Sequence, residues 1–546
     1  MNRFARLLDQ LTYQPRRNGK LALITAYLAE APDPDRGFAL AALTGALSFA
    51  HAKPGAIRAL AAEKLDPVLF ALSYDFVGDL SETVALMWPA PARTDGEAAA
   101  RPEPPSLAGI VEGLATTPRA GVPALLDHWL AGLDETGRWA LLKLVTGGLR
   151  VGVSARLAKT AVARLGAGIS PDEVEEVWHG LEPPYGALFA WLEGRGPRPE
   201  ASDGAPFRSP MLAHALDEAD FATLDPGAFR AEWKWDGIRV QAVAGSDGGR
   251  RIARLYSRSG DDISNAFPEI VAALDFEGAI DGELLIRREG RVAPFSVLQQ
   301  RLNRKTVTRT LMRDFPPIIR AYDLLALGGE DLRALPFEAR RARLEMFVAG
   351  LGSDMIDLSP TVPFADWQAL AAARADPTSA GAGVDAGAVE GVMLKRADSP
   401  YLAGRPKGPW FKWKRDPFNV DAVLMYAQRG HGKRSSFYSD YTFGVWRGDE
   451  LVPVGKAYFG FTDAELGQID RFVRENTVNR FGPVREVTHT AETGLVFEVA
   501  FEGLNRSPRH KAGLAMRFPR IARLRWDKRP SDADRIEALE ALLPRG

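Results

Sequence analysis

The amino-acid sequence predicts a multidomain protein with an all-α N-terminal domain, a central α+β domain and a C-terminal all-β barrel. Its 546 residues exceed what one hydrophobic core accommodates, since a domain usually takes about 100 to 200 residues. Apolar residues recur at helical spacing over the first third, whereas short strand-like runs follow a Pro- and Gly-rich linker. We therefore expect domains at residues 1–200, 207–417 and 418–546.

The first domain is expected to be helical because Phe4, Leu7, Leu8 and Leu11 recur three and four residues apart. This spacing places them on one face of a helix. Within the domain, residues 89–106 are rich in Pro and Ala and offer little to bury, which predicts an exposed loop or linker.

A glycine-studded turn at residues 146–154 enters another helical stretch. Glycines that allow close backbone approach, together with Arg150 and a helix N-terminus, suit contact with a phosphate backbone or a minor groove. A plain connection between two helices explains the same residues equally well.

After the linker at residues 194–206, the pattern changes to short strands and helices. Strand-like runs lie at 239–243, 254–257, 279–286, 318–322 and 391–394, and helical patterns lie at 293–302 and 337–348. This order predicts an α+β domain of antiparallel character. From residue 420 onward, alternating strands such as 441–446 and 495–501 predict a small barrel, as in the oligonucleotide-binding fold (OB-fold).

Composition excludes several classes of protein. A hydrophobic fraction of 46% with 25% charged residues indicates a soluble globular chain. The absence of cysteine excludes disulfides, thiolate catalysis and cysteine-ligated zinc. With 69 Lys and Arg against 70 Asp and Glu, only local clusters can indicate nucleic-acid binding. Neither a signal core nor a run of about 20 apolar residues is present, so we expect a cytoplasmic protein without a membrane partner.

A K-x-D-G-x-R element at residues 234–239 places the amine of Lys234 beside a carboxylate, a glycine and a cation. Lysine becomes a nucleophile only when its proton is displaced, because its ordinary pKa is about 10.4. The element therefore needs further cations around it. Taken alone, a solvated strand face explains these residues better.

Five further elements follow in order: S-R-S-G at 257–260, D-G-E at 281–283, Y-D-L-L at 322–325, E-G-V-M-L-K at 390–395 and W-F-K-W-K at 410–414. Singly, each has an ordinary explanation, such as a surface turn, a core aromatic or a solvated pair between Glu390 and Lys395. Together they supply an amine, cations, carboxylates and an aromatic ring beside turns. That set suits the binding of a nucleoside triphosphate and attack on it.

This ordered series, with R-F-P-R and R-W-D-K at residues 517–528, resembles the motif set of the ATP-dependent DNA ligases, members of the covalent nucleotidyltransferase superfamily. The match runs from Phe207 to Lys528. The helical region is similar in size and texture to the DNA-binding domain of the longer ligases, and L-R-V-G at 149–152 is its most suggestive short match. The resemblance thus implies that the central domain is an adenylation domain.

The resemblance also implies roles for residues that contact the nucleotide. Lys234 would attack the α-phosphate of ATP and keep AMP as a phosphoramidate. Glu232 would accept a hydrogen bond from the adenine amino group, and Tyr322 would stack on the purine. Glu283 would bind the ribose hydroxyl and serve as a second ligand of Mg²⁺.

Charged residues would complete that site by the same resemblance. Glu390 would hold Mg²⁺, an ion that prefers oxygen ligands. Lys412 and Lys414 would contact the α-phosphate region. Arg239 and Arg258 would bind the nucleotide or the 5′-phosphate of a nick.

Three basic stretches mark the C-terminal domain, at residues 429–434, 504–511 and 517–528. Any one could be a solvated patch, but three in a strand-rich domain indicate phosphate contact. The resemblance implies that Arg517 and Lys528 orient the β- and γ-phosphates of ATP. The domain would then swing away about a hinge at residues 415–419.

The resemblance therefore implies an enzyme that adenylates itself, transfers AMP to the 5′-phosphate of a nick and seals nicked duplex DNA. A monomer would encircle the DNA and recognise backbone and shape, in repair, replication or recombination. An NAD-dependent ligase is excluded because that family carries a four-cysteine zinc module. The alternatives are an RNA ligase, a capping-type nucleotidyltransferase and a non-catalytic nick-binding protein.

Overall fold

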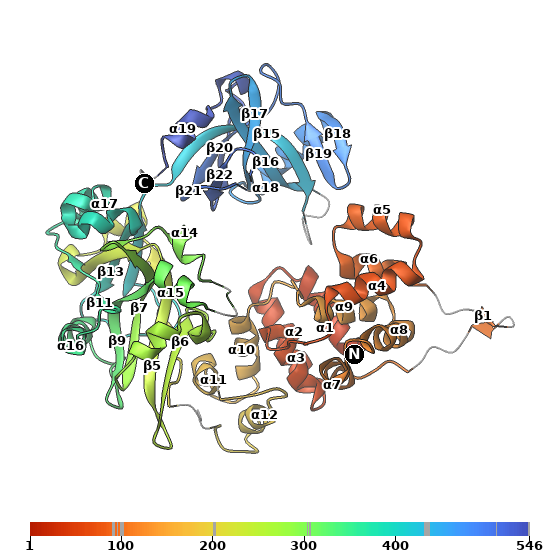
Figure 1. Cartoon of the computed structure of the whole chain (residues 1–546), viewed down its shortest axis with the longest axis horizontal. Coiled ribbons are helices and arrows are strands. Elements are labelled where there is room, and N and C mark those ends of the chain that lie inside the picture. The colour runs from red at the N-terminus through yellow and green to blue at the C-terminus, as the bar shows by residue number, and fades with distance from the viewer. Residues whose placement is uncertain are drawn as a thin grey trace. The chain divides into compact units, whose positions relative to one another are not determined.

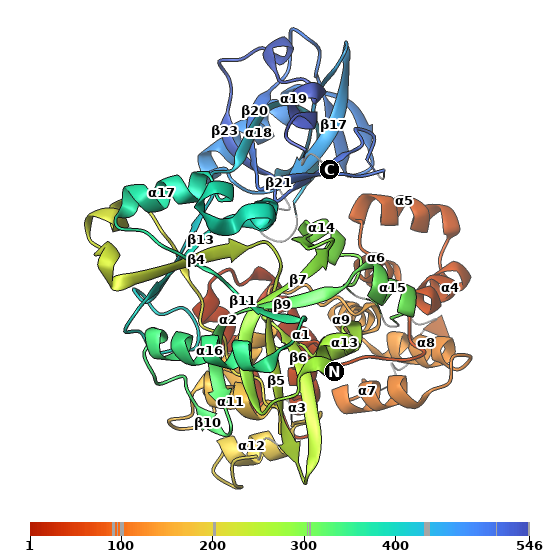
Figure 2. The same cartoon turned by 60° about the vertical axis from the view of Figure 1, so that its left-hand side comes forward.

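The protein is described by a computed structural model that covers residues 1–89, 93–94, 97–98, 103–178, 180–199, 204–302, 304, 307–430, 437–508 and 510–543 (Figures 1 and 2). The chain divides into two compact units. One comprises Met1–Ala167, Glu182–Arg195 and Pro417–Gly546, and the other comprises Gly168–Leu181 and Gly196–Asp416. We call the second one the central unit. None of the described helices is long and apolar enough to cross a membrane.

The N-terminal region is helical, as predicted. Its helices are α1 (Asn2–Tyr13), α2 (Arg17–Glu30), α3 (Asp35–Thr44), α4 (Pro54–Lys64), α5 (Pro67–Val77), α6 (Leu80–Met87), α7 (Leu107–Thr116), α8 (Val122–Gly132), α9 (Glu135–Thr146), α10 (Ala155–Ala163) and α12 (Gly186–Leu192). The predicted stripe on α1 is buried, with Phe4, Leu7, Leu8 and Leu11 at most 3% exposed. In the Pro- and Ala-rich segment, β1 (Arg93–Thr94) pairs with β2 (Glu97–Ala98), and half of the segment lies outside the described residues.

The glycine-studded turn has an unusual backbone. Gly147, Arg150 and Gly152 all have positive φ angles, of 72°, 48° and 65°. The buried ammonium of Lys20 donates hydrogen bonds to the carbonyls of Val151 and Gly152, at 2.5 and 3.1 Å. These bonds fix the turn before α10, and its contact with a phosphate backbone stays a prediction.

The central unit contains two antiparallel sheets. The first has the order β10 (Glu330–Asp331), β9 (Pro317–Leu327), β7 (Gly278–Arg288), β5 (Ile238–Asp247) and β6 (Arg250–Ser257), with β8 (Arg291–Val292) on β7 and β11 (Ile356–Leu358) parallel to β9. The second has the order β12 (Thr361–Val362), β4 (Phe229–Trp235), β13 (Val389–Arg396), β14 (Trp410–Lys414) and β3 (His214–Ala215), the last parallel to β14. The predicted strands are therefore present.

Among the described residues, six α-helices and three hydrophobic clusters accompany the two sheets of the central unit. The helices are α11 (Pro171–Trp178), α13 (Pro268–Ala273), α14 (Phe295–Leu298), α15 (Arg309–Asp314), α16 (Phe337–Leu351) and α17 (Trp367–Ala375). One cluster lies beneath each sheet, and a third joins Val243 and Leu325 of the first sheet to Trp410 of the second. Side chains of both sheets therefore meet in one core.

The helix expected at residues 293–302 is much shorter than predicted. Only Phe295–Leu298 is α-helical, after Pro294, which has no backbone N–H to extend the helix toward the N-terminus. The chain then continues in tighter turns, with Gln300 bonded to Val297 and Arg301 to Leu298. In contrast, the expected helix at 337–348 is present as α16.

The C-terminal region is rich in β-strands, as predicted. Its strands are β15 (Phe418–Arg429), β16 (Tyr438–Arg447), β17 (Glu450–Ala457), β18 (Thr477–Phe481), β19 (Val484–Val487), β20 (Val496–Phe501), β21 (Gly503–Arg506), β22 (Leu514–Arg517) and β23 (Arg520–Leu524). Helices α18 (Asp463–Glu475) and α19 (Ile536–Glu540) accompany them. Strand β15 pairs with β16, β19 and β20, but the ladders among the described strands do not close into a barrel.

Candidate active site

The pleat of β4 places Lys234 on the site side of the second sheet. Successive side chains of a strand point to opposite faces. Trp233 and Trp235 are buried in the hydrophobic cluster beneath that sheet, so Glu232 and Lys234 share the other face. Gly237 follows in the turn after β4, where an added Cβ would lie 2.5 Å from the carbonyl oxygen of Leu284. Glycine is therefore required for the close approach of this turn to β7.

Strands β13 and β14 bring the other predicted groups to Lys234. The ammonium of Lys234 forms a salt bridge with Glu390 on β13, and Lys414 on β14 lies 3.5 Å from the second oxygen of that carboxylate. A bulge between Val389 and Val392 breaks the regular pairing of β13 with β4 where Glu390 lies. The structure therefore brings together three residues that are distant in sequence.

Further cations surround this pair. Burial lowers the pKa of Lys412, and nearby positive charges lower it further; these belong to Lys234, Arg405, Lys414 and Arg258. Several cations within electrostatic range of one another are unfavourable unless an anion joins them. The arrangement therefore suits a polyphosphate.

Glu232 lies at the buried side of the site. Its side chain is 2% exposed, and its two oxygens accept hydrogen bonds from different cations. Arg341 of α16 lies 2.7 Å from Oε1, and Lys395 of β13 lies 2.7 Å from Oε2. The solvated Glu390–Lys395 pair considered above is thus wrong, because Lys395 is only 1% exposed and pairs with Glu232.

Tyr322 lies close to the same lysine. The Lys395 ammonium is 4.5 Å from the centre of the Tyr322 ring and donates a hydrogen bond of 3.0 Å to the Tyr322 carbonyl. It also lies 4.6 Å from the ring centre of Trp410 and 4.8 Å from that of Phe337. The aromatic residue predicted to stack on a base and the carboxylate predicted to recognise it thus share one buried cation.

Arg239 is held firmly by its neighbours. Its guanidinium donates to both carboxylate oxygens of the buried Asp281, at 3.0 and 2.5 Å, and to Tyr401 and the Met211 carbonyl. Burial alone would lower the pKa of Arg239, but the charge and hydrogen bond of Asp281, together with Tyr322 and Tyr401, outweigh burial and hold that pKa well above its usual range. Four of its five N–H donors are engaged, so it has one N–H left for a ligand.

Glu283 completes the group from β7, where it lies opposite Arg239 of β5. Burial raises its pKa to about 8, and the negative charges of Glu390 and Asp281 add to this effect, while Lys234 and Arg239 oppose it. Two carboxylates, Glu283 and Glu390, therefore lie near Lys234. Arg258 is exposed at the turn after β6.

Two predicted residues, Lys528 and Arg517, lie in the other compact unit, and their approach to the nucleotide stays a prediction. Lys528 forms a salt bridge with Asp421 of β15, which also pairs with Arg525 at 3.1 Å. Arg517 ends β22 beside the exposed ring of Phe518. Of the other basic stretches, 431–434 and residue 509 lie outside the described residues.

Sequence reasoning missed four residues of this site: Arg341, Lys395, Arg405 and Asp281. Lys395 and Asp281 belong to the E-G-V-M-L-K and D-G-E elements, so their place in these motifs could have identified them as site residues. Arg341 lies in a helix with two other arginines, and Arg405 lies in a loop without a motif. Only the fold distinguishes those two from surface cations.

Comparisons with known proteins match two regions of the chain to one family. Residues 210–414 match the model of the ATP dependent DNA ligase domain, and residues 434–528 match that of the ATP dependent DNA ligase C terminal region. A probable DNA ligase of Koribacter versatilis is 37% identical, over 61% of this chain and 59% of the relative. A probable DNA ligase of Anaeromyxobacter dehalogenans is 36% identical, over 76% of this chain and 79% of the relative.

A solved structure named Pmar-Lig_Pre has the same fold. Its TM-score is 0.58 at 16% identity, and the alignment covers 96% of this chain and 99% of that one. Because the two matched regions span more than half of the sequence and the Anaeromyxobacter relative is similar over most of its length, the chain belongs to the ATP-dependent DNA ligases.

Proposed function

We propose that this ATP-dependent DNA ligase seals nicks through covalent adenylation of Lys234. The observation that carries the proposal is the position of the Lys234 amine, between the carboxylate of Glu390 and a group of cations that suits a polyphosphate. Nζ attacks the α-phosphorus of ATP, an N–P bond forms, and pyrophosphate leaves. The 5′-phosphate of the nick then displaces Lys234 from AMP, and the 3′-hydroxyl displaces AMP to form the phosphodiester.

Base selection rests on Glu232. The two cations that bind its oxygens fix the carboxylate in place, and a carboxylate accepts hydrogen bonds but donates none. Such a group favours the amino group of adenine and disfavours the oxygen that guanine carries at the same position. Tyr322 stacks on the purine, and Glu283 receives a ribose hydroxyl. Met393 pairs across the sheet with Glu232 and Lys412, so it offers an apolar contact beside them.

Phosphate binding falls to the lysines and arginines. Lys412 and Lys414 neutralise the charge that spreads over the α-phosphate during transfer, which is the main requirement of this reaction. Arg258 and Arg405 extend the positive charge toward the substrate phosphates. Arg239 acts chiefly through its bonds to Asp281, which fix the site wall, and contributes its remaining N–H to a phosphate.

The two carboxylates fit a magnesium ion. Glu283 and Glu390 lie near each other, and the charge of Glu390 helps to raise the pKa of Glu283, a repulsion that a divalent cation relieves. In the described parts of the chain, no three acidic or histidine residues are arranged so that they alone could hold a metal ion, so waters and ATP oxygens would supply the other ligands. When bound, Mg²⁺ would neutralise phosphate charge and weaken the hold of Glu390 on Lys234.

The remaining parts of the chain serve DNA. We propose three domains, at residues 1–200, 207–417 and 418–546, with the C-terminal one as an OB-fold and the whole as a monomer on nicked duplex DNA. The strand-rich C-terminal region and its matched family region support this division. Arg517 and Lys528 would orient the leaving pyrophosphate.

A gel of the protein with α-labelled ATP tests the proposal. The wild type should acquire labelled AMP and lose it when nicked DNA is added, with the appearance of sealed product. Lys234→Ala should remain unlabelled, whereas Lys407→Ala, which changes an exposed lysine of the same unit, should be labelled normally. Labelling of Lys234→Ala would refute the nucleophile, and preference for GTP would refute the role of Glu232.

A further inference from the structure

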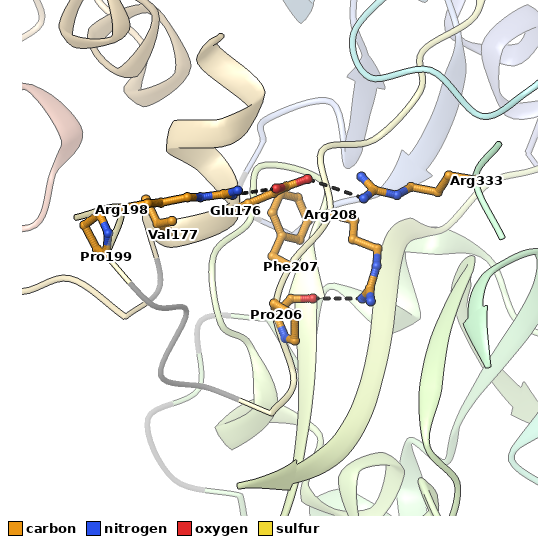
Figure 3. A pocket seen from close by; sticks show the side chains of 8 residues that line it. All are labelled: Glu176, Val177, Arg198, Pro199, Pro206, Phe207, Arg208 and Arg333. Carbon is orange, nitrogen blue, oxygen red and sulfur yellow. Dashed lines mark hydrogen bonds and ion pairs between the residues drawn. The ribbon is translucent and has the colours of Figure 1, made fainter. Parts of the chain in front are cut away.

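The central unit contains a cavity whose lining is rich in arginine. Its volume is about 560 Å³, and it is lined by α11, by residues 198–199 and 206–208, and by Arg333, which follows β10 (Figure 3). Arg198, Arg208 and Arg333 line it, together with one acid, Glu176 of α11. Phe207, Val177, Pro199 and Pro206 form its apolar part. None of these residues has a role in the adenylation site.

The single acid is shared between two of the arginines. Glu176 lies 2.8 Å from Arg198 and 3.3 Å from Arg333, as the dashed lines in Figure 3 show. Arg333 also pairs with Asp331 at 2.6 Å, outside the cavity lining. The cavity therefore holds a carboxylate already, which shows that it stabilises an anion.

Arg208 has no such acid. Its backbone is fixed, because its N–H donates to the Gln241 side chain at 2.7 Å and its carbonyl accepts from the same amide at 2.9 Å. Within the described residues, its guanidinium donates only to the Pro206 carbonyl, at 3.2 Å. A guanidinium has five N–H donors, so most of its capacity is open to a ligand.

The surroundings of Arg208 also make a bare cation unfavourable. Burial lowers its pKa, and the positive charge of Arg333 lowers it further, while Asp331 and Glu176 compensate only in part. A buried cation without a full counter-charge destabilises the protein, so such a cation is expected where an anion binds. Arginine prefers phosphate among common anions because its planar donors match two phosphate oxygens at once.

We propose that this cavity is a second phosphate site, which binds a phosphate group through Arg208 in competition with Glu176. The cavity is large enough for a phosphate with an attached sugar, and its apolar residues suit a sugar face. In a DNA ligase, the phosphodiester backbone of the substrate is the main source of this group, and free phosphate is the second source.

The salt dependence of DNA binding tests the first source. Each phosphate that a cation neutralises contributes about 0.9 to the slope of log Kd against log salt. Arg208→Met should reduce the slope by that amount with nicked duplex, and Arg208→Lys should restore it. Arg343→Met removes a cation of α16 that pairs with Glu330 outside the cavity, and should keep the wild-type slope.

Glu176→Gln tests whether removal of the acid strengthens or weakens DNA binding. If the cavity binds phosphate, removal of the resident carboxylate strengthens DNA binding several-fold. If Glu176 and the arginines only dock α11, the same change weakens docking and does not improve binding. Thermal unfolding of each variant checks that it is folded, and labelled-AMP formation should be unchanged in all of them, which separates this inference from the role of Lys234.

Inorganic phosphate and pyrophosphate test the second source. If these anions stabilise the wild type but not Arg208→Met, and the salt dependence of DNA binding is the same in both, the cavity binds free phosphate. The proposal is overturned if Arg208→Met alters neither the DNA slope nor the response to the two anions.

Discussion

Lys395 provides the sharpest test of how the base-recognition site is built. Lys395→Met keeps most of the unbranched side chain but removes the cation from one oxygen of Glu232. Both partners are buried, at 1% and 2% exposure, so water cannot replace the lost bond. Removal of one partner of a buried pair costs about 3 to 5 kcal/mol. We expect about 3 kcal/mol here, the lower end of that range, because Arg341 still pairs with Glu232.

Calorimetry can measure this loss. For a unit of this size, about 1 kcal/mol corresponds to a shift of about 2 to 4 °C, so the melting temperature should fall by about 6 to 12 °C. The relevant transition is the one that ATP raises, because ligand binding stabilises the unit that contains the site. Lys407→Met, at an exposed lysine, is the control and should leave that transition unchanged. A shift no larger than that of the control would refute the buried-pair argument.

The same variant should also lose base selectivity. Without Lys395, Glu232 loses one of the two cations that orient its carboxylate, so its oxygens are no longer held in one position toward the 6-amino group of the purine. The ratio of adenylation rates with ATP and with a triphosphate that lacks the 6-amino group should therefore fall toward one. A loss of stability alone would lower both rates equally and leave the ratio unchanged, which would contradict the role of Glu232 in base recognition.

Two further predictions concern the other compact unit. Lys528→Ala should slow lysyl-AMP formation about 100-fold, as expected for loss of a charge contact in the transition state. It should slow the sealing of a pre-adenylated nick much less. Lys456→Ala, at an exposed lysine of β17, is the control, and equal losses in both steps would contradict a role limited to adenylation. Glu193→Gln should destabilise the protein at pH 7 but less and less as the pH falls. The hydrogen bond from Arg36 lowers the pKa of Glu193 to about 2, so its stabilisation is complete above about pH 4.5 and disappears toward pH 2. Thermal unfolding of both proteins over this range checks it, and a constant difference would contradict the assignment.

Much of the fold could be predicted because it depends on local patterns. The apolar stripe of α1 has the period of a helix, and β20 is a short apolar run rich in Val and Phe, so both elements were predictable from sequence. The extent of α14 was not, because the tighter turns after Leu298 depend on how that segment packs. Closure of the C-terminal barrel stays a prediction, since the ladders of the described strands leave it open.

The sequence alone determined which chemical groups are available, because ordered motifs name Lys234, Glu390 and the Lys412–Lys414 pair directly. Only the tertiary structure decided their partners. Lys395 follows Glu390 by five residues, yet the pleat and bulge of β13 send it to Glu232, while helix α16 brings Arg341 to the same carboxylate from far along the chain. Ion pairing depends on distance in space and on burial, and neither is encoded in residue spacing along the chain.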